Sequence, residues 1–179
     1  IRLLQGSSAS LDAAELGKFR LVTIGRAFHW MDRVPTLRSL DKLLVPGGAI
    51  ALFAEQYPEV PANAWHADFQ ALIDSYSTHD PARPQLRSSL RHEAVLLDSA
   101  FDHLERIAVL EPRDTPLERF VDRALSFATT WHGRPGSREK DLAHEVRRVL
   151  APYADERGNI REVLEGQALV AWRSADVGA

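Results

Sequence analysis

The sequence contains no cysteine in 179 residues, and methionine occurs once. Without cysteine there can be no disulfide, no thiolate nucleophile and no cysteine-ligated zinc or iron–sulfur site. No apolar stretch approaches the roughly 20 residues that a membrane-spanning helix needs. We therefore expect a cytoplasmic protein that has no membrane as a partner.

Motifs of two other kinds of site are also missing. No Gly-x-Ser-x-Gly occurs, so the turn that carries the nucleophile in α/β-hydrolases is absent. The seven histidines show no HxxxH pairing and no spacing with carboxylates on an expected helix. We therefore expect neither a serine hydrolase nor a metal site.

Charge and composition describe an ordinary globular protein. The net charge is -3, from 22 basic and 25 acidic residues that are mixed along the chain. This balance gives no general attraction to nucleic acid or to an anionic membrane. Hydrophobic residues make up 45% of the sequence, and a chain of this length is long enough to bury a core as one domain.

The most informative stretch is FRLVTIGRAFHWMD, residues 19–32. Its run Leu21 to Ile24 is mostly β-branched and almost wholly apolar, which is typical of a strand that is covered on both faces. Gly25 then allows the backbone to turn or another group to approach closely. In open α/β sheets ligands bind at the carboxyl ends of the strands. The side chains expected there are Arg26, Phe28, His29 and Trp30.

A second strand is expected shortly afterwards. Residues Val34 to Leu44 have leucines at helical spacing, and Pro46-Gly47-Gly48 ends this helix. The apolar run Ala49 to Phe53 predicts the strand, whose carboxyl end is followed by Glu55-Gln56-Tyr57.

The rest of the chain alternates helices, loops and strands. Thr115-Pro116-Leu117-Glu118 is typical of a capping box with proline at the first helical position. Residues 158–165 are expected to form a turn and connection. The other expected elements are a strand over 1–5, a helix over 62–77, a short helix within 88–100, a strand over 103–110, helices over 117–128 and 137–153, and a last strand over 167–173.

Residues 19–32, followed by a helix and then Leu44-Val45-Pro46-Gly47-Gly48-Ala49, resemble class I S-adenosylmethionine-dependent methyltransferases. The closest likeness is to the small-molecule type, which has an aromatic-His-Trp loop after the fourth strand. That strand usually begins Phe-Asp-Leu-Val in the family, and here Arg20 replaces the aspartate. The motifs cover residues 1–53, and beyond them only the order of helices and strands agrees.

The resemblance implies an α/β, Rossmann-like methyltransferase fold, with sheet order 3-2-1-4-5-7-6. The chain would supply strands 3 to 7, with residues 1–5 as strand 3. A helical cover over residues 54–100 would be inserted after the fifth strand. We expect residues 1–179 to form a single domain, corresponding to the carboxyl-terminal two-thirds of a methyltransferase.

The resemblance also implies roles for individual residues. His29 would be the catalytic base, since its ordinary pKa near 6.5 suits proton removal at neutral pH. Trp30 and Tyr57 would contact the acceptor. The residues expected to bind the S-adenosylmethionine cofactor are Ser7, Ser8, Gly25, Arg26 and Phe28.

Each of these roles has a structural alternative. His29 can instead be packed beside Trp30, and for Trp30 itself we favour packing because large aromatic side chains are usually buried. Arg26 can hold a carboxylate of cofactor or substrate, or form a surface ion pair. For the small residues Ser7 and Ser8 the favoured alternative is a loop or a helix cap.

The family's glycine-rich loop and the acidic residue that ends its second strand have no counterpart in this sequence. No Gly-x-Gly-x-Gly occurs anywhere. We therefore expect a fragment or a proteolysed product. Strand 3 would lose its neighbour and strand 4 would be exposed at an edge, where a second copy could pair to give a homodimer.

Two functions follow from these expectations. The first is S-adenosylmethionine-dependent methyl transfer to a small-molecule acceptor, inactive or impaired in this fragment. The acceptor class suggested by relatives with this loop is a carboxylic acid. The alternative is a non-catalytic Rossmann-like module for interaction or oligomerisation.

Overall fold

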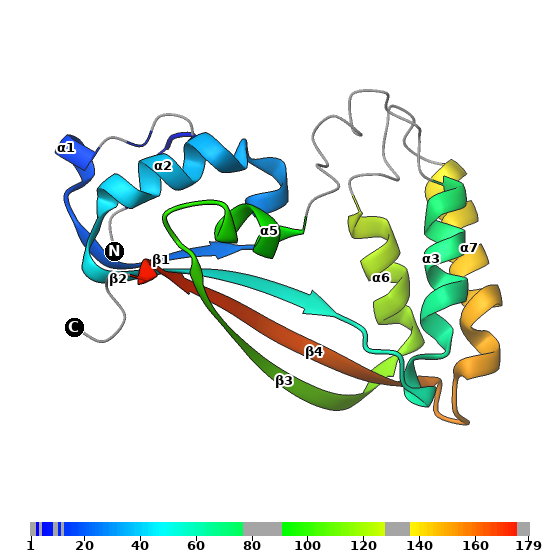
Figure 1. Cartoon of the computed structure of the whole chain (residues 1–179). Helices are drawn as coiled ribbons and strands as arrows, with labels where there is room; N and C mark the ends of the chain where they lie inside the picture. Colours follow the sequence, from blue (N-terminus) through cyan, green and yellow to red (C-terminus); the bar gives the residue numbers. More distant parts are fainter. Residues whose placement is uncertain are drawn as a thin grey trace. The chain divides into compact units, whose positions relative to one another are not determined.

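The computed structural model describes residues 3, 5–8, 11, 13–76, 91–127 and 137–174. Its four strands form one sheet in the order β1-β2-β4-β3 (Figure 1). They are β1 (Phe19–Gly25), β2 (Leu44–Gln56), β3 (His103–Pro116) and β4 (Asn159–Trp172). This order is the one that the resemblance implies for strands 4, 5, 7 and 6, and the predicted α/β methyltransferase-like fold is confirmed.

Helices connect and flank these strands. The α-helices are α1 (Ala13–Leu16), α2 (Arg33–Leu43), α3 (Trp65–Tyr76), α5 (His92–Leu97), α6 (Leu117–Ser126) and α7 (Ser137–Leu150). Short 3-10 helices are η2 (Phe28–Trp30), η3 (Pro61–Asn63) and η5 (Ala151–Tyr153). Across the described ranges, no helix combines the length and the apolar character that crossing a bilayer requires.

The chain divides into two compact units, which we describe separately. The first unit comprises Ile1–Glu55, Pro81–Val109 and Gly166–Ala179. The second unit comprises Gln56–Asp80 and Leu110–Glu165. The predicted single domain over 1–179 and the predicted cover over 54–100 stay predictions.

Strands β1 and β2 of the first unit are parallel, and Leu21 pairs with Ala49 and Gly25 with Phe53. Because the two strands run in the same direction, their carboxyl ends lie at the same edge of the sheet. The segments that follow them are therefore brought together, as the sequence predicts.

The strand was predicted to start after the Pro-Gly-Gly motif, at Ala49. In the structure β2 begins at Leu44, so the motif lies inside the strand. Gly47 adopts a φ of +71°, a conformation that favours glycine. At Gly48 a Cβ atom would lie 2.9 Å from the Val45 carbonyl oxygen and 3.2 Å from the Leu44 side chain. The two glycines thus let the chain pass directly from α2 into the strand.

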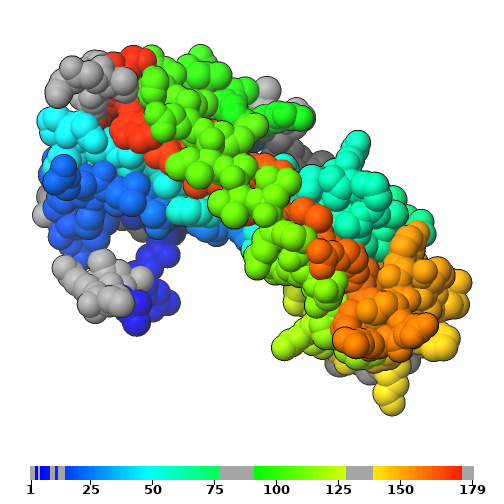
Figure 2. Space-filling view, turned by 90° about the horizontal axis from the view of Figure 1, so that it is seen from below, coloured from blue at the N-terminus to red at the C-terminus, as the bar shows by residue number. Residues whose placement is uncertain are grey.

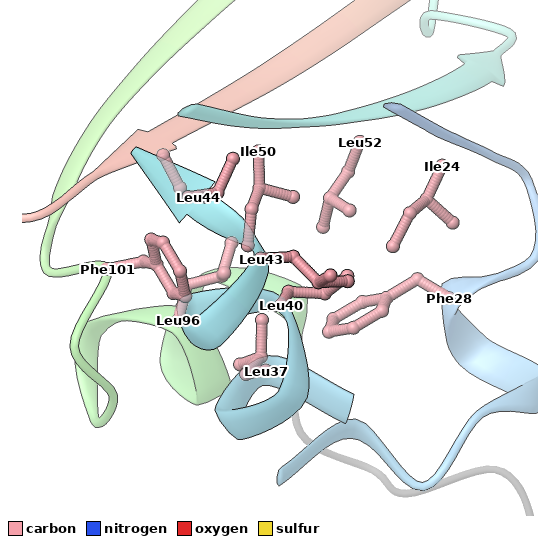
Figure 3. Packing of buried hydrophobic residues seen from close by; sticks show 11 residues of the cluster. Ile24, Phe28, Leu37, Leu40, Leu43, Leu44, Ile50, Leu52, Leu96 and Phe101 are labelled. Carbon is pink, nitrogen blue, oxygen red and sulfur yellow. The ribbon is translucent and has the colours of Figure 1, made fainter. Parts of the chain in front are cut away.

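The core of the first unit lies between the sheet and helices α2 and α5 (Figure 3). Ile24 and Ile50 project from β1 and β2 toward Leu40 of α2, while Leu96 and Phe101 close the other end. Phe28, from the loop after β1, also points into this cluster and is 2% exposed. The aromatic loop is therefore anchored in the core by its phenylalanine.

Several large apolar side chains of this unit remain on the surface. Leu21, Phe53, Ile107 and Val109 are each about half exposed or more. Figure 2 shows side chains of β3, in green, on the surface of the molecule. Among the described strands β1 lies at an edge of the sheet, as expected for the fourth strand. The prediction that this strand is covered on both faces is wrong, because Ile24 is its only buried residue and Leu21 is 53% exposed.

The core of the second unit is built from α3, α6 and α7. Trp65, Phe69 and Phe120 pack in edge-to-face contacts, with ring centroids 4.7 to 6.2 Å apart. Val146 and Leu150 of α7 complete the cluster and are fully buried.

The predicted capping box at the start of α6 is wrong. Pro116 is the residue before the helix, not its first residue, and no side chain caps the helix. The Thr115 hydroxyl instead donates a hydrogen bond to Glu162 Oε1 at 2.7 Å. Glu162 is 1% exposed, and a buried carboxylate needs donors more than an exposed helix end does.

The last two strands are longer than predicted. Residues 158–165 are not a connection, because β4 starts at Asn159, and β3 continues past Glu111 to Pro116. The helix predicted within 88–100 is the short α5. The strand predicted over 1–5 lies largely outside the described residues, as does the end of the helix predicted over 117–128.

Candidate functional site

The candidate site begins where β1 and β2 end. Arg26, directly after β1, has a φ of +51°, the left-handed conformation that is costly for a side chain with a Cβ atom. Its backbone N–H donates to the Phe53 carbonyl oxygen at 3.1 Å, which extends the β1–β2 pairing by one residue. Strained backbone of this kind is concentrated at functional sites.

The side chain of Arg26 crosses to the end of β2. Its Nη1 donates to Glu55 Oε2 at 3.2 Å, and the two side chains are 68% and 50% exposed. An ion pair this accessible contributes little to stability. The guanidinium of Arg26 can therefore leave Glu55 and bind the carboxylate of a ligand with little loss of folding free energy.

His29 and Trp30 follow in the short helix η2. Their rings lie 4.7 Å apart between centroids and are tilted by 44°. Trp30 is 45% exposed, so our preference for Trp30 as a packing residue is wrong. Phe28 alone supplies the buried anchor, which leaves the other two rings near the surface of the loop.

Helix α5 adds His92, which the sequence analysis did not single out. The His92 ring meets the Phe28 ring edge-on, with centroids 5.1 Å apart. Arg33 Nη1 donates to His92 Nδ1 at 3.4 Å. Burial first, and then the charges of Arg33 and His29, lower the pKa of His92, while Glu93 acts in the opposite direction.

A cavity of about 220 Å³ is formed by these segments. The polar and charged groups at its wall come from the segment after β1, from β2, β3 and β4, and from α5 of the first unit. They are Arg26, His29, Glu55, His92, Glu93, Arg106 and Gln167. Arg106 and Glu93 form a second ion pair. The cavity therefore offers two guanidinium groups, two carboxylates and two imidazoles at the sheet edge where ligands bind in this class of fold.

A larger cavity of about 580 Å³ shares the lining residue Ile24 with the smaller one. Ser7 and Ser8 contribute hydroxyl groups to its wall. The apolar part of the wall includes Val22, Met31 and Leu40. Its volume falls within the range of about 300–1,000 Å³ that is common for small-molecule sites.

The residues predicted to form the site do not all meet. Arg26, Phe28 and His29 line the smaller cavity, and Ser7 and Ser8 line the larger one. Gly25 lies at the end of β1, in register with Phe53. Tyr57 belongs to the second unit.

Tyr57 has its own surroundings there. Its ring lies 5.0 Å from those of Trp65 and His66, and the Arg123 guanidinium lies 5.3 Å from its centroid. The predicted contact of Tyr57 with an acceptor stays a prediction, as does that of Trp30.

Three residues near the cavity were missed because they are far apart in the sequence. They are Arg33 of α2, His92 of α5 and Arg106 of β3. No motif surrounds them, and only the folded sheet places Arg106 of β3 and His92 of α5 at one cavity. Within the described ranges no group of three or more histidine, cysteine or acidic residues is arranged to hold a metal ion.

The larger cavity fits one end of the cofactor that the resemblance implies. Hydroxyl groups beside an apolar wall suit a purine, which is flat and carries hydrogen-bonding atoms at its edge. Ser7, Ser8 and Met31 would hold that ring. The sequence has no glycine-rich loop for the methionine end.

No protein-family model and no curated protein matches this sequence. Among solved structures, a protein proposed to be a type II methyltransferase from Anaeromyxobacter dehalogenans aligns with a TM-score of 0.52. It is 12% identical, over 86% of this chain and 63% of that one. At this identity the likeness concerns the fold alone.

Two further structures align with lower scores. A proposed methyltransferase from Bacillus halodurans C-125 has a TM-score of 0.47 at 15% identity, over 93% of this chain and 69% of that one. The YcgJ protein of Bacillus subtilis has a TM-score of 0.49 at 19% identity, over 95% of this chain and 70% of that one. The chain thus spans about two-thirds of the length of these three proteins.

Proposed function

We propose that the protein takes part in S-adenosylmethionine-dependent methyl transfer to a small molecule. The observation that carries this proposal is the cavity at the carboxyl ends of the parallel strands β1 and β2, with His29 at its wall. The fold, shared with a proposed methyltransferase, and the motifs of residues 19–49 support it.

The two cavities would divide the ligands between them. The larger one would hold the adenine end of the cofactor with Ser7 and Ser8, and the smaller one would hold the acceptor. When bound, S-adenosylmethionine supplies a methyl group activated by a sulfonium. At about 220 Å³ the smaller cavity lies below the range usual for drug-sized ligands, so it suits a small acceptor or one end of a larger one.

The residues of the smaller cavity would orient the acceptor and receive its proton. His29 would take the proton from the acceptor atom as that atom gains the methyl group. Arg26, whose partner Glu55 is exposed, would bind a carboxylate of the acceptor or the cofactor. We keep a carboxylic acid as the expected class of acceptor, and Trp30 and Tyr57 as expected contacts.

We expect the 179 residues alone to bind the cofactor weakly or not at all, since no Gly-x-Gly-x-Gly is present. Calorimetric titration of this chain with S-adenosylmethionine tests that expectation, and micromolar affinity would refute it. The complete reading frame is informative too. A strand followed by a glycine-rich loop upstream of Ile1 favours the enzyme, whereas a start at Ile1 favours a non-catalytic module.

His29→Ala in the protein translated from the complete frame tests the base. Turnover should fall much more than cofactor affinity, because His29 lines the smaller cavity and not the larger one. Unchanged turnover removes His29 as the base.

The exposed apolar side chains of the first unit favour the second candidate, an interaction or oligomerisation module that could form a homodimer. Leu21 lies on β1, the edge strand among the described strands, and Phe53 on the neighbouring β2, and they are 53% and 47% exposed. Sedimentation of the wild-type chain and of Leu21→Glu separates the candidates. Concentration-dependent association that the substitution abolishes would favour the module.

A further inference from the structure

His92 has a defined hydrogen-bonding state in the smaller cavity. An arginine side chain only donates hydrogen bonds, so His92 Nδ1, 3.4 Å from Arg33 Nη1, must be the accepting nitrogen of the ring. In the neutral imidazole the proton then resides on Nε2. His92 therefore carries one N–H donor that is not used by Arg33.

The ring is held in place by buried neighbours. Phe28 is 2% exposed and contacts the imidazole edge-on, and Arg33 is 8% exposed. Both neighbours are fixed by the core, because Phe28 packs in the cluster between the sheet and α2, and Arg33 begins α2. A ring held from two directions loses little further freedom when it binds a ligand.

Burial, and after it the neighbouring charges, lower the pKa of His92 below its ordinary value of 6.5, so that the ring is neutral near pH 7. Arg33 faces it from α2 and His29 from η2, and both lower its pKa. Glu93, next to it on α5, opposes them but is itself paired with Arg106 of β3. The accepting nitrogen of His92 is already bonded to Arg33, so toward a ligand the ring can only donate.

We propose that His92 is a fixed, neutral hydrogen-bond donor that binds an oxygen atom of the small molecule held in this cavity. Arg33 is the positioning residue that sets the tautomer. The proposal rests on the proposed function and deepens it. His29 and His92 would share the acceptor, with His29 in the role of base and His92 in the role of hydrogen-bond donor.

The test uses the 179-residue chain and sodium benzoate as the probe, because benzoate combines accepting oxygens with an apolar ring. Nitrogen-correlated NMR of the histidine rings should show His92 as the Nε2–H tautomer at pH 7. Adding benzoate should move the His92 and His29 ring signals, with a midpoint that gives the dissociation constant.

Two variants separate a binding role from a structural one. His92→Gln places an amide N–H near the position of Nε2, and the shorter His92→Asn places an amide oxygen near Nδ1, where it can still accept from Arg33. We expect the dissociation constant for benzoate, followed at His29, to rise by about tenfold to a hundredfold in His92→Asn. In His92→Gln it should stay within about threefold of wild type, as expected when the lost hydrogen bond is replaced.

Three results would overturn the proposal. They are an Nδ1–H or protonated His92 at pH 7, no response of the wild-type rings to benzoate, and equal loss of binding in both variants with unchanged unfolding temperatures. None of these measurements uses methyl transfer or the cofactor. Failure here therefore leaves the proposed function to its own tests, and failure of cofactor binding does not decide the role of His92.

Discussion

The two compact units use similar residue types in opposite ways. In the second unit the carboxylate of Glu162 is 1% exposed and accepts hydrogen bonds from Thr115 and from both terminal nitrogens of Arg123. Arg123 in turn lies over the Phe120 ring, 4.7 Å from its centroid. In the first unit the Arg26–Glu55 pair is largely exposed at the wall of a cavity.

The difference shows how a structural ionic network can be told from a binding one. At Glu162 the donors are supplied by the protein and water is excluded, so the network contributes to a specific packing of the second unit. At Arg26 and His92 the groups border a cavity, and a ligand can reach them. The following variants test this distinction, beginning with the largest effect.

Removing the buried carboxylate should destabilise the second unit most. Glu162→Ala leaves Arg123 without its partner and Thr115 without its acceptor. We expect a loss of about 3 kcal/mol in the free energy of unfolding. This is the lower end of the range for breaking a buried ion pair, because a quarter of the Arg123 side chain is exposed. Urea unfolding measures it. A loss below that of the control, Arg161→Ala, would contradict the account.

The control breaks an ion pair of the same unit that is exposed. Arg161 Nη1 and Asp114 Oδ1 are 2.9 Å apart, with side chains 56% and 60% exposed. Arg161→Ala should cost about 0–1 kcal/mol.

The Thr115 hydroxyl should contribute less to the free energy of unfolding than the whole Glu162 network, but more than an exposed ion pair. Thr115→Val keeps the shape of the side chain and removes the hydrogen bond to Glu162. We expect a loss of about 1–3 kcal/mol in urea unfolding, typical of a hydrogen bond to a charged group. A loss of only a few tenths of a kcal/mol in the free energy of unfolding would mean that Arg123 alone satisfies the carboxylate.

Arg26 should be more important for binding than for stability. Arg26→Gly relieves the positive φ and Arg26→Ala retains it, while both remove the exposed pair with Glu55. We expect the glycine variant to unfold with a free energy about 1 kcal/mol higher than the alanine variant. Benzoate binding should weaken in both. Equal stability of the two variants would show that the backbone at Arg26 is not strained.

The smallest effect concerns two imidazoles, one in each unit. Burial lowers the pKa of both His92 and His66 from 6.5, with Arg33 and Arg123 acting in the same direction. Above pH 6.5 both states are neutral and this stabilisation is complete. As the pH falls from 6.5 toward the lowered folded pKa, the unfolded chain binds protons first and stability decreases.

His92→Gln and His66→Gln should therefore each flatten the dependence of unfolding free energy on pH between 7 and 5. Only His92 lines the cavity, so benzoate should stabilise wild type and His66→Gln but bind His92→Asn poorly. A steeper pH dependence in either glutamine variant would reverse the sign that we assign.

Much of the first unit could be predicted from sequence because its signals are local. The apolar run before Gly25, the helix after Asp32 and the Pro-Gly-Gly motif give three consecutive elements, and the family motif gives their order. Arg26 and His29 follow from the same stretch. Their place at the end of a parallel strand requires no long-range information.

The remainder depended on contacts that no local pattern reveals. Thr115 has the spacing of a helix cap, but it bonds Glu162, 47 residues away. Residues 158–165 contain Gly158, which favours a turn, yet β4 begins immediately after it because β2 and β3 lie on either side. His92 is a candidate because the folded chain places α5 beside Phe28 and Arg33, which no local pattern indicates.

The central claim is that the cavities at the ends of β1 and β2 serve S-adenosylmethionine-dependent methyl transfer. Calorimetric titration of S-adenosylhomocysteine, the demethylated cofactor, into the protein translated from the complete reading frame tests it most directly. We predict one-to-one binding, weakened by Ser7→Ala together with Ser8→Ala and unaffected by His29→Ala. No binding by the complete protein would contradict the account.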